Sequence, residues 1–310
     1  MLYHRHQVLT APDGHNIQVQ IWQPENEACC IFHVLHGLGE YGNRYGRFAS
    51  SAVERGYAVC VHDHRGHGEF ADEPGHFADS TGWHKINSDT EIVHDFIREQ
   101  FQGAPIVLLG HSMGSYLAQV FAMHYGPQLS ALILSASTWP SKVQLAPLKL
   151  LAHIESWRLG IRGKSALLDK LGFGNFNKPF LPARTELDWL SRDEAEVDKY
   201  VADPLCGGPY SCGLWLDLIG GLFSVCSDHA VTRVPYDLPI LITGGESDPI
   251  GGDKGMTKLA MRYTQTSHQR LSVKIYPGGR HEMLNEINRD EVTADWLNWV
   301  AATTHTGRSG

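Results

Sequence analysis

The sequence contains no long apolar run and no basic cluster, and each absence excludes a class of protein. No stretch of its 310 residues reaches 18 uncharged apolar residues, so no transmembrane segment is expected. Lys and Arg number 26 against 34 Asp and Glu, which gives a net charge of −8, and they never gather into a basic block. We therefore expect neither a nucleic-acid partner nor a polybasic membrane anchor. Small neutral or apolar ligands are favoured instead.

The sequence also lacks a secretory signal and the cysteine spacings that are typical of metal or redox sites. The first residues turn polar at Asp13 to Asn16 before any apolar segment appears, so no secretory signal is predicted. The six cysteines show no Cys-x-x-Cys spacing, and three of them lie in apolar, strand-like runs. We expect reduced, mostly buried thiols and a cytoplasmic location.

Short apolar runs alternate with helical patterns through the first part of the chain. Residues 7–10 and 17–22 flank a turn and predict an antiparallel hairpin. Continuously apolar runs, typical of strands buried on both faces, follow at residues 29–35, 57–61, 105–109 and 129–134. Helical patterns separate them at residues 47–55, 88–101 and 113–125. This alternation predicts an α/β fold with a mostly parallel sheet flanked by helices.

The alternation stops after Ser137 and resumes at Leu238. Between these points no run resembles a buried parallel strand, and apolar residues recur at helical spacing. We therefore expect residues 1–137 and 237–310 to form the core and residues 138–236 to form an inserted, mainly helical cap. The resumed pattern predicts strands at 238–243 and 271–276 and helices at 254–263 and 290–302.

A Gly-x-Ser-x-Gly motif, Gly110-His111-Ser112-Met113-Gly114, lies between a predicted buried strand and a predicted helix. A serine on such a sharp turn needs small neighbours, and its hydroxyl then stands near the N-terminus of the helix. Ser112 is the candidate nucleophile.

A serine nucleophile needs a base, and in this arrangement an acid and then a histidine follow along the chain. Polar turns follow the last two predicted strands, where open α/β sheets carry their ligands. We predict Asp248 as the orienting carboxylate, with Glu246 in the same turn as its alternative, and His281 as the general base and acid.

The developing oxyanion needs two hydrogen-bond donors. The N–H of Met113, directly after the nucleophile, is one candidate. The other is the N–H of Leu38, because Gly37 and Gly39 let the loop after the first parallel strand turn inward.

Five motifs in order resemble the α/β-hydrolase superfamily, and more closely its monoglyceride lipase and lysophospholipase-like serine hydrolases. They are His36-Gly37-Leu38-Gly39-Glu40 with Arg44-Tyr45, Asp63-His64-Arg65-Gly66-His67-Gly68, Gly110 to Gly114, Asp248-Pro249, and Gly278-Gly279-Arg280-His281-Glu282. Cap segments at 185–193 and 203–207 look like those of bacterial lysophospholipase-like members. The resemblance implies hydrolysis of a carboxylic ester, a lid over the serine and no cofactor. Tyr41 and Ser115 depart from the usual pattern.

Histidine is abundant, with 18 residues, and the densest cluster is His62, His64 and His67. Alone it would suggest a metal site. In the resembling family this turn is structural, so we expect no metal and a local pair between Asp63 and Arg65. His36 and His111 are expected to form hydrogen bonds around the site rather than to act as bases.

The predicted reaction is cleavage of a lipid-like ester, a monoacylglycerol or lysophospholipid, through an acyl-enzyme on Ser112. The alternative is a short-chain carboxylesterase or another acyl-transfer activity of the same fold. The cap carries two strongly apolar stretches, at residues 143–157 and 214–223, which favour packing on the core and an acyl site beneath. A further hypothesis is that the cap makes transient contact with a membrane surface. The sequence carries no signal for an oligomeric state.

Overall fold

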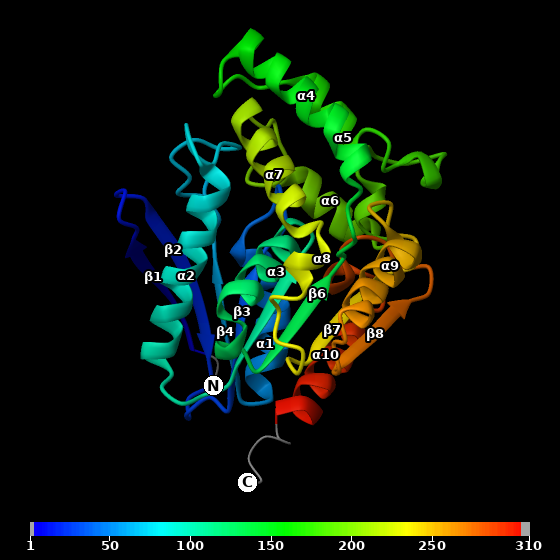
Figure 1. Ribbon diagram of the computed structural model, residues 1–310. Coiled ribbons are helices and arrows are strands. Elements are labelled where there is room, and N and C mark those ends of the chain that lie inside the picture. Colours follow the sequence, from blue (N-terminus) through cyan, green and yellow to red (C-terminus); the bar gives the residue numbers. More distant parts are fainter. Residues whose placement is uncertain (1–2, 305–310) are drawn as a thin grey trace.

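An eight-stranded sheet runs through the centre of the computed structural model, which describes residues 3–304 (Figure 1). The strands lie in the order β1-β2-β4-β3-β5-β6-β7-β8. β1 and β2 form the predicted antiparallel hairpin, β2 is antiparallel to β4, and the remaining neighbours are parallel. The strands are β1 (Tyr3–Thr10), β2 (Asn16–Gln23), β3 (Cys30–Leu35), β4 (Tyr57–His62), β5 (Ile106–His111), β6 (Ala131–Ser135), β7 (Ile240–Gly245) and β8 (Leu271–Tyr276).

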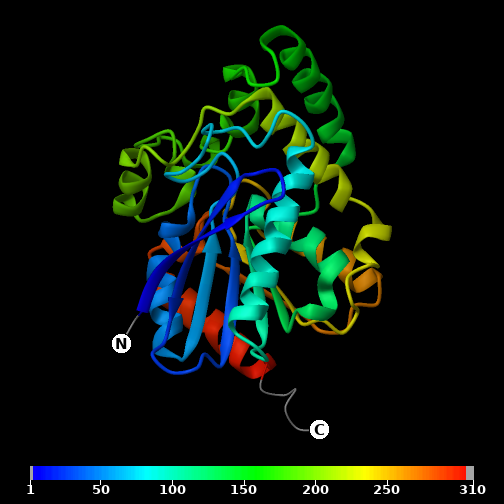
Figure 2. The same ribbon diagram turned by 90° about the vertical axis from the view of Figure 1, so that its left-hand side faces the viewer.

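The central strands are mostly apolar because helices cover both faces of the sheet (Figures 1 and 2). Every residue of β3, β4, β5, β6 and β7 is buried. α1 and α10 pack on one face, whereas α2, α3 and α9 pack on the other. These helices are α1 (Gly46–Glu54), α2 (Gly82–Gln100), α3 (Met113–Tyr125), α9 (Gly252–Gln265) and α10 (Arg289–Thr304). The predicted α/β-hydrolase fold with a mostly parallel sheet is confirmed.

The segment between β6 and β7 is helical and lies beyond the carboxyl ends of the parallel strands (Figure 1). α7 packs against α3 through Leu214, Leu218 and other buried residues of one apolar cluster. α4 and α5 lie outermost, at the top of Figure 1. The helices are α4 (Lys142–Leu159), α5 (Ala166–Phe173), α6 (Glu194–Ala202), α7 (Cys212–Val225) and α8 (Asp228–Val231). None of the described helices has the length and apolarity that crossing a membrane requires.

Helix α2 begins six residues earlier than its sequence pattern predicts, at Gly82 rather than residue 88. These six additional residues are stabilised by a residue distant in sequence. The carboxylate of Asp217 on α7 accepts hydrogen bonds from the N–H groups of Gly82 and Trp83 at the start of the helix. No local pattern in the sequence could indicate that partner.

Candidate active site

Ser112 stands on a sharp turn between β5 and α3. Its φ of 52° and ψ of −118° are values that a non-glycine residue adopts only where the surrounding structure holds it. The N–H of Ser112 donates to the carbonyl of Ser135 on β6, over 2.9 Å. A Cβ on Gly110 or Gly114 would overlap neighbouring backbone atoms. The Gly-x-Ser-x-Gly spacing is therefore a packing requirement of this turn.

The structure brings His281 and Asp248 together. Nδ1 of His281, in the loop after β8, lies 3.0 Å from both carboxylate oxygens of Asp248, and both side chains are buried. Burial alone would lower the pKa of His281, but the charge of Asp248, supported by Glu282 and Glu40, outweighs it and raises that pKa above its ordinary value.

Glu246, the alternative to Asp248, lies in the same turn but points elsewhere. It is exposed, and its Oε2 accepts a hydrogen bond from the N–H of Gly278 over 2.9 Å. The geometry therefore distinguishes the two acids, which the sequence alone left open.

Two N–H groups of the loop after β3 donate to side chains of the core. The N–H of Gly37 donates to Oε1 of Glu40 over 2.6 Å, and the N–H of Gly39 donates to Nε2 of His67 over 3.2 Å. The N–H of Leu38 has no acceptor among residues 3–304. Met113 is the first residue of α3, where N–H groups have no partner within the helix. These are the two donors that the sequence predicts for an oxyanion.

Ser112, His281 and Leu38 line one cavity of about 570 Å³. Asp248 is not among its lining residues, and neither is Met113, whose side chain is buried. The segment between β6 and β7 supplies the apolar and aromatic wall, and Ile250 completes it. That wall comprises Phe173, Leu187, Trp189, Leu190, Tyr200 and Tyr210.

A buried charge cluster that the sequence did not reveal lies beside His281. One guanidinium nitrogen of Arg44 donates to Glu40 over 2.9 Å, and Arg44 also donates to both oxygens of Glu282 over 2.6 Å. Tyr45 donates its hydroxyl to Glu40 over 2.9 Å. The four-residue spacing of Glu40 and Arg44 is a local signal, whereas nothing in the sequence links Arg44 to Glu282.

The local pair predicted between Asp63 and Arg65 is wrong. Asp63 instead accepts a hydrogen bond from the N–H of Gly42 over 2.7 Å. Arg65 forms bidentate hydrogen bonds with Asp89 on α2 and with Asp13 in the hairpin turn. The turn after β4 thus ties together three segments that are distant in sequence, and this pairing depends on how those segments pack.

His36 and His111 form hydrogen bonds beside the loop of Leu38 and the turn of Ser112. His36 Nδ1 donates to the carbonyl of Gly37 over 2.8 Å, and its Nε2 accepts from the N–H of His64 over 2.9 Å. Nδ1 of His111 lies 3.2 Å from the hydroxyl of Ser135. Across residues 3–304, no group of three or more His, Cys, Asp or Glu side chains is arranged to hold a metal ion.

Comparison with known proteins places the chain in a family. Residues 26–288 match the family described as serine aminopeptidase, S33. The chain belongs to this family. Like its S33 relatives it is an α/β hydrolase, which confirms the resemblance inferred from the five motifs.

Several named enzymes are similar to this S33 family chain over nearly its whole length. It is 28% identical to the monoglyceride lipase of Homo sapiens, covering 96% of the chain and 91% of that enzyme. It is 25% identical to the monoacylglycerol lipase of Mycolicibacterium smegmatis, covering 93% and 94% respectively. The structure of a thermostable carboxyl esterase from Bacillus coagulans in complex with glycerol superposes with a TM-score of 0.89, at 25% identity, covering 97% and 99%. The predicted enzyme class, a carboxylic ester hydrolase, is confirmed.

Proposed function

We propose that this enzyme cleaves the ester of a lipid-like substrate, a monoacylglycerol or a lysophospholipid, through an acyl-enzyme on Ser112. The observation that carries the proposal is the buried pair of His281 and Asp248, because His281 lines the same cavity as Ser112. The named lipases and the esterase that resemble the chain support the same choice of substrate.

The proposed reaction assigns one role to each group. His281 takes the proton of the Ser112 hydroxyl at Nε2, because its Nδ1 faces Asp248, and the serine oxygen attacks the ester carbonyl. The N–H groups of Leu38 and Met113 stabilise the oxyanion. When the tetrahedral intermediate collapses, the alcohol leaves with the proton from His281. Water then repeats these steps on the acyl-enzyme and releases the acid.

Residues 138–236 act in this proposal as the cap over a core formed by 1–137 and 237–310. The aromatic and aliphatic wall that this segment supplies suits an acyl chain. Charged side chains stand where the cavity meets solvent, with Lys170 and Glu186 both exposed.

We also propose that α4 touches the surface of the lipid aggregate that carries the substrate. Val143, Leu150, Ile154 and Trp157 are exposed, and Trp157 keeps 89% of its surface. Their spacings of seven, four and three residues place them along one face of the helix. Burying such a face in a lipid interface removes apolar surface from water.

A panel of esters with acyl chains from C2 to C18 and with glycerol or lysophospholipid head groups tests the function. We expect long-chain esters of glycerol or of lysophospholipids to be preferred, and Ser112→Ala to lose turnover and fluorophosphonate labelling while keeping its thermal unfolding transition. A preference for C2 or C4 esters would support the short-chain alternative. Near-normal hydrolysis by Ser112→Ala would refute the assignment of the nucleophile.

The same panel tests α4 when the long-chain ester is presented in vesicles. Trp157→Glu is expected to lower vesicle binding and vesicle hydrolysis while leaving hydrolysis of a monomeric C4 ester unchanged. Met261→Glu, at an exposed position of α9, is the matched control. Equal losses in both variants would contradict a specific role of α4.

A further inference from the structure

The loop that carries Leu38 is held by the segment between β6 and β7 as well as by the core. The carbonyl oxygen of Gly39 accepts two hydrogen bonds from that segment, from the hydroxyl of Tyr200 on α6 over 2.7 Å and from the N–H of Gly207 over 2.8 Å. Two residues on, the hydroxyl of Tyr41 donates to Asp203 over 2.8 Å. Three hydrogen bonds thus join residues 39–41 to residues 200–207.

Gly39 is shaped for this close approach. Its φ of +76° lies in the left-handed region that glycine favours, and a Cβ there would overlap the hydroxyls of Tyr200 and Tyr210. The absence of a side chain is what lets the two tyrosines reach the backbone of the loop.

Successive peptide groups of this loop have separate anchors. The carbonyl of Gly37, in the same peptide group as the N–H of Leu38, is held by His36. The N–H of Gly39 is held by His67. The carbonyl of Gly39, in contrast, accepts its hydrogen bonds from Tyr200 and Gly207, in the segment between β6 and β7.

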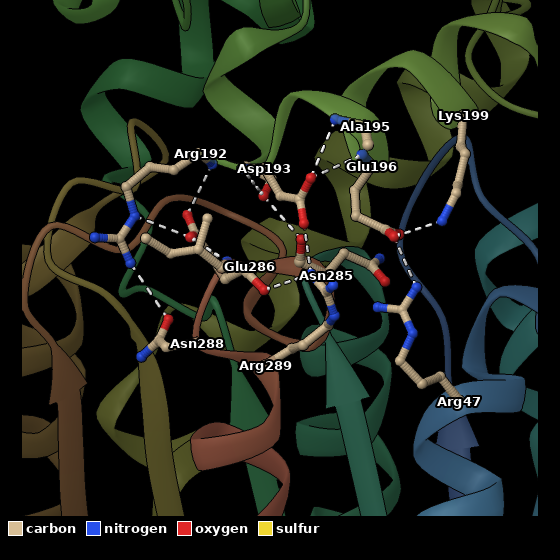
Figure 3. A network of polar contacts seen from close by, with 12 residues as sticks. Arg47, Arg192, Asp193, Ala195, Glu196, Lys199, Asn285, Glu286, Asn288 and Arg289 are labelled. Carbon is tan, nitrogen blue, oxygen red and sulfur yellow. Dashed lines mark hydrogen bonds and ion pairs between the residues drawn. The ribbon is translucent and has the colours of Figure 1, made fainter.

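Ion pairs with the core also hold helix α6 in place (Figure 3). Glu196 pairs with Arg47 of α1 over 2.8 Å, and Asp193, at the start of α6, pairs with Arg289 over 2.6 Å. The Asp193 carboxylate also accepts the N–H groups of Ala195 and Glu196, which caps the helix. Tyr200 lies one helical turn beyond Glu196. The same short helix therefore carries both the ion pair with Arg47 and the hydrogen bond to Gly39.

We infer that Tyr200 is a positioning residue for the oxyanion hole. By holding the Gly39 carbonyl it fixes the turn in which the N–H of Leu38 faces Ser112, so the hole is complete only while α6 is seated on the loop. Two glycines make this turn adaptable, and without the anchor the loop has conformations in which the donor is misdirected. The inference rests on the proposed serine mechanism and adds a condition to it.

Tyr200→Phe removes the hydroxyl and keeps the ring. We expect kcat for a monomeric ester to fall about 10- to 100-fold, less than the roughly 100- to 1000-fold cost of losing an oxyanion donor itself, with KM changed less than about threefold. Affinity for a trifluoromethyl ketone, which forms a tetrahedral adduct, should fall in proportion to kcat. The acid limb of the pH profile should not move, because His281 is untouched.

Asp198→Asn is the matched control, because it removes an ion pair with Arg184 on the exposed face of the same helix, and neither residue lines the cavity. Its kcat is expected to stay within about twofold of the wild type. Tyr41→Phe, whose hydroxyl bonds Asp203 outside the cavity lining, supplies a second test in case Tyr200→Phe does not fold, and it should lower kcat at constant KM.

The two hypotheses fail in different ways. If the proposed function is wrong, the wild type itself shows no serine-dependent ester hydrolysis. If only this inference is wrong, the wild type is active and Tyr200→Phe retains kcat, or changes KM alone as a substrate contact would, or Asp198→Asn loses as much kcat as Tyr200→Phe.

Discussion

The imidazole of His281 is surrounded by an unusual amount of buried charge. Asp248 binds Nδ1, the ring of His111 lies 4.9 Å away between centroids, and the carboxylates of Glu282 and Glu40 stand nearby. Burial alone would raise the pKa of Glu282, but its ion pair with Arg44 holds that pKa below its ordinary value. Glu282 is therefore ionised when His281 titrates, and it favours the imidazolium form.

Removing the charge of Glu282 should make His281 a weaker base. Because the pKa of His281 in the folded enzyme is raised in part by Glu282, Glu282→Gln is expected to move the acid limb of the kcat/KM profile to lower pH. The measurement is kcat/KM for a non-ionising ester between pH 4.5 and 9.

Glu99→Gln, at an exposed position near the end of α2, should leave that limb in place. An acid limb that stays fixed or moves to higher pH in Glu282→Gln would show that the charge of Glu282 does not act on His281. Circular dichroism of both variants at the lowest pH separates titration from unfolding.

Among the secondary-structure elements, α3 packs against β3 with no space between their backbones. Gly114, in the first turn of α3, lies so close to β3 that a Cβ would overlap the carbonyl oxygen of Leu35. The contact presses the N-terminus of the helix against the strand whose end carries the loop of Leu38. Packing at this one position therefore sets the distance between the two predicted oxyanion donors.

Two glycine-to-alanine substitutions in helices should have opposite effects on stability. Gly114→Ala is expected to destabilise the fold by about 1–3 kcal/mol, because the helix must shift from β3. Gly220→Ala in α7, where a Cβ would meet open space, should stabilise by about 0.4–1 kcal/mol. Urea denaturation measures both. Equal effects of the two changes would contradict the packing argument, and the shift in Gly114→Ala should also lower kcat.

The strands and core helices could be predicted from the sequence because their signals are local. Continuous apolar runs bounded by turns identify β3 to β7, and Gly-x-Ser-x-Gly places Ser112 without any knowledge of the rest of the chain. The partners of α6 could not be found this way, because Arg47 and Arg289 are 149 and 96 residues away from the acids they bind. The contact of Tyr200 with Gly39 spans 161 residues.

At the scale of the whole molecule, the abundant histidines form a neutral interior network. Nδ1 of His33 on β3 lies 3.4 Å from Nδ1 of His94 on α2, and Nε2 of His33 lies 3.5 Å from His62 on β4. Both ring nitrogens of His64 are buried without a hydrogen-bond partner in the described chain. Water cannot solvate an imidazolium at these positions while the protein stays folded.

Burial lowers the pKa of nine histidines among residues 3–304, and all of these except His4 and His268 are buried side chains. That pKa falls to about 3 for His36, His62 and His67, to about 4 for His94 and His111, and well below 6.5 for His33 and His64. The unfolded chain binds these protons near pH 6.5, so it holds more protons than the folded one below that pH. The stability that these groups contribute is present above pH 6.5 and is lost as the pH falls towards 4.

Four groups among residues 3–304 oppose this trend. Burial raises the pKa of Asp63 to about 6 and also raises the pKa of Asp169 and of Asp217, and the pKa of His281 is raised as well, so all four favour the folded state in acid. They offset only part of the effect of the seven buried histidines. The net effect is that the unfolded chain takes up several protons between pH 6.5 and 4, each worth about 1.4 kcal/mol per pH unit.

We therefore expect the free energy of unfolding to fall steeply below pH 6.5. His94→Gln should reduce the slope by about one proton, because Gln keeps a polar side chain beside Phe121 and does not titrate. His153→Gln, at an exposed position of α4, makes the same substitution outside the core and is the control. Urea denaturation at half-unit steps from pH 7.5 to 4.5 measures all three slopes. A free energy of unfolding that stays constant between pH 6.5 and 5 would mean that the buried imidazoles find water or a counter-charge in the folded state. Equal slopes of this free energy in the wild type and His94→Gln would mean that His94 does not destabilise the fold in acid.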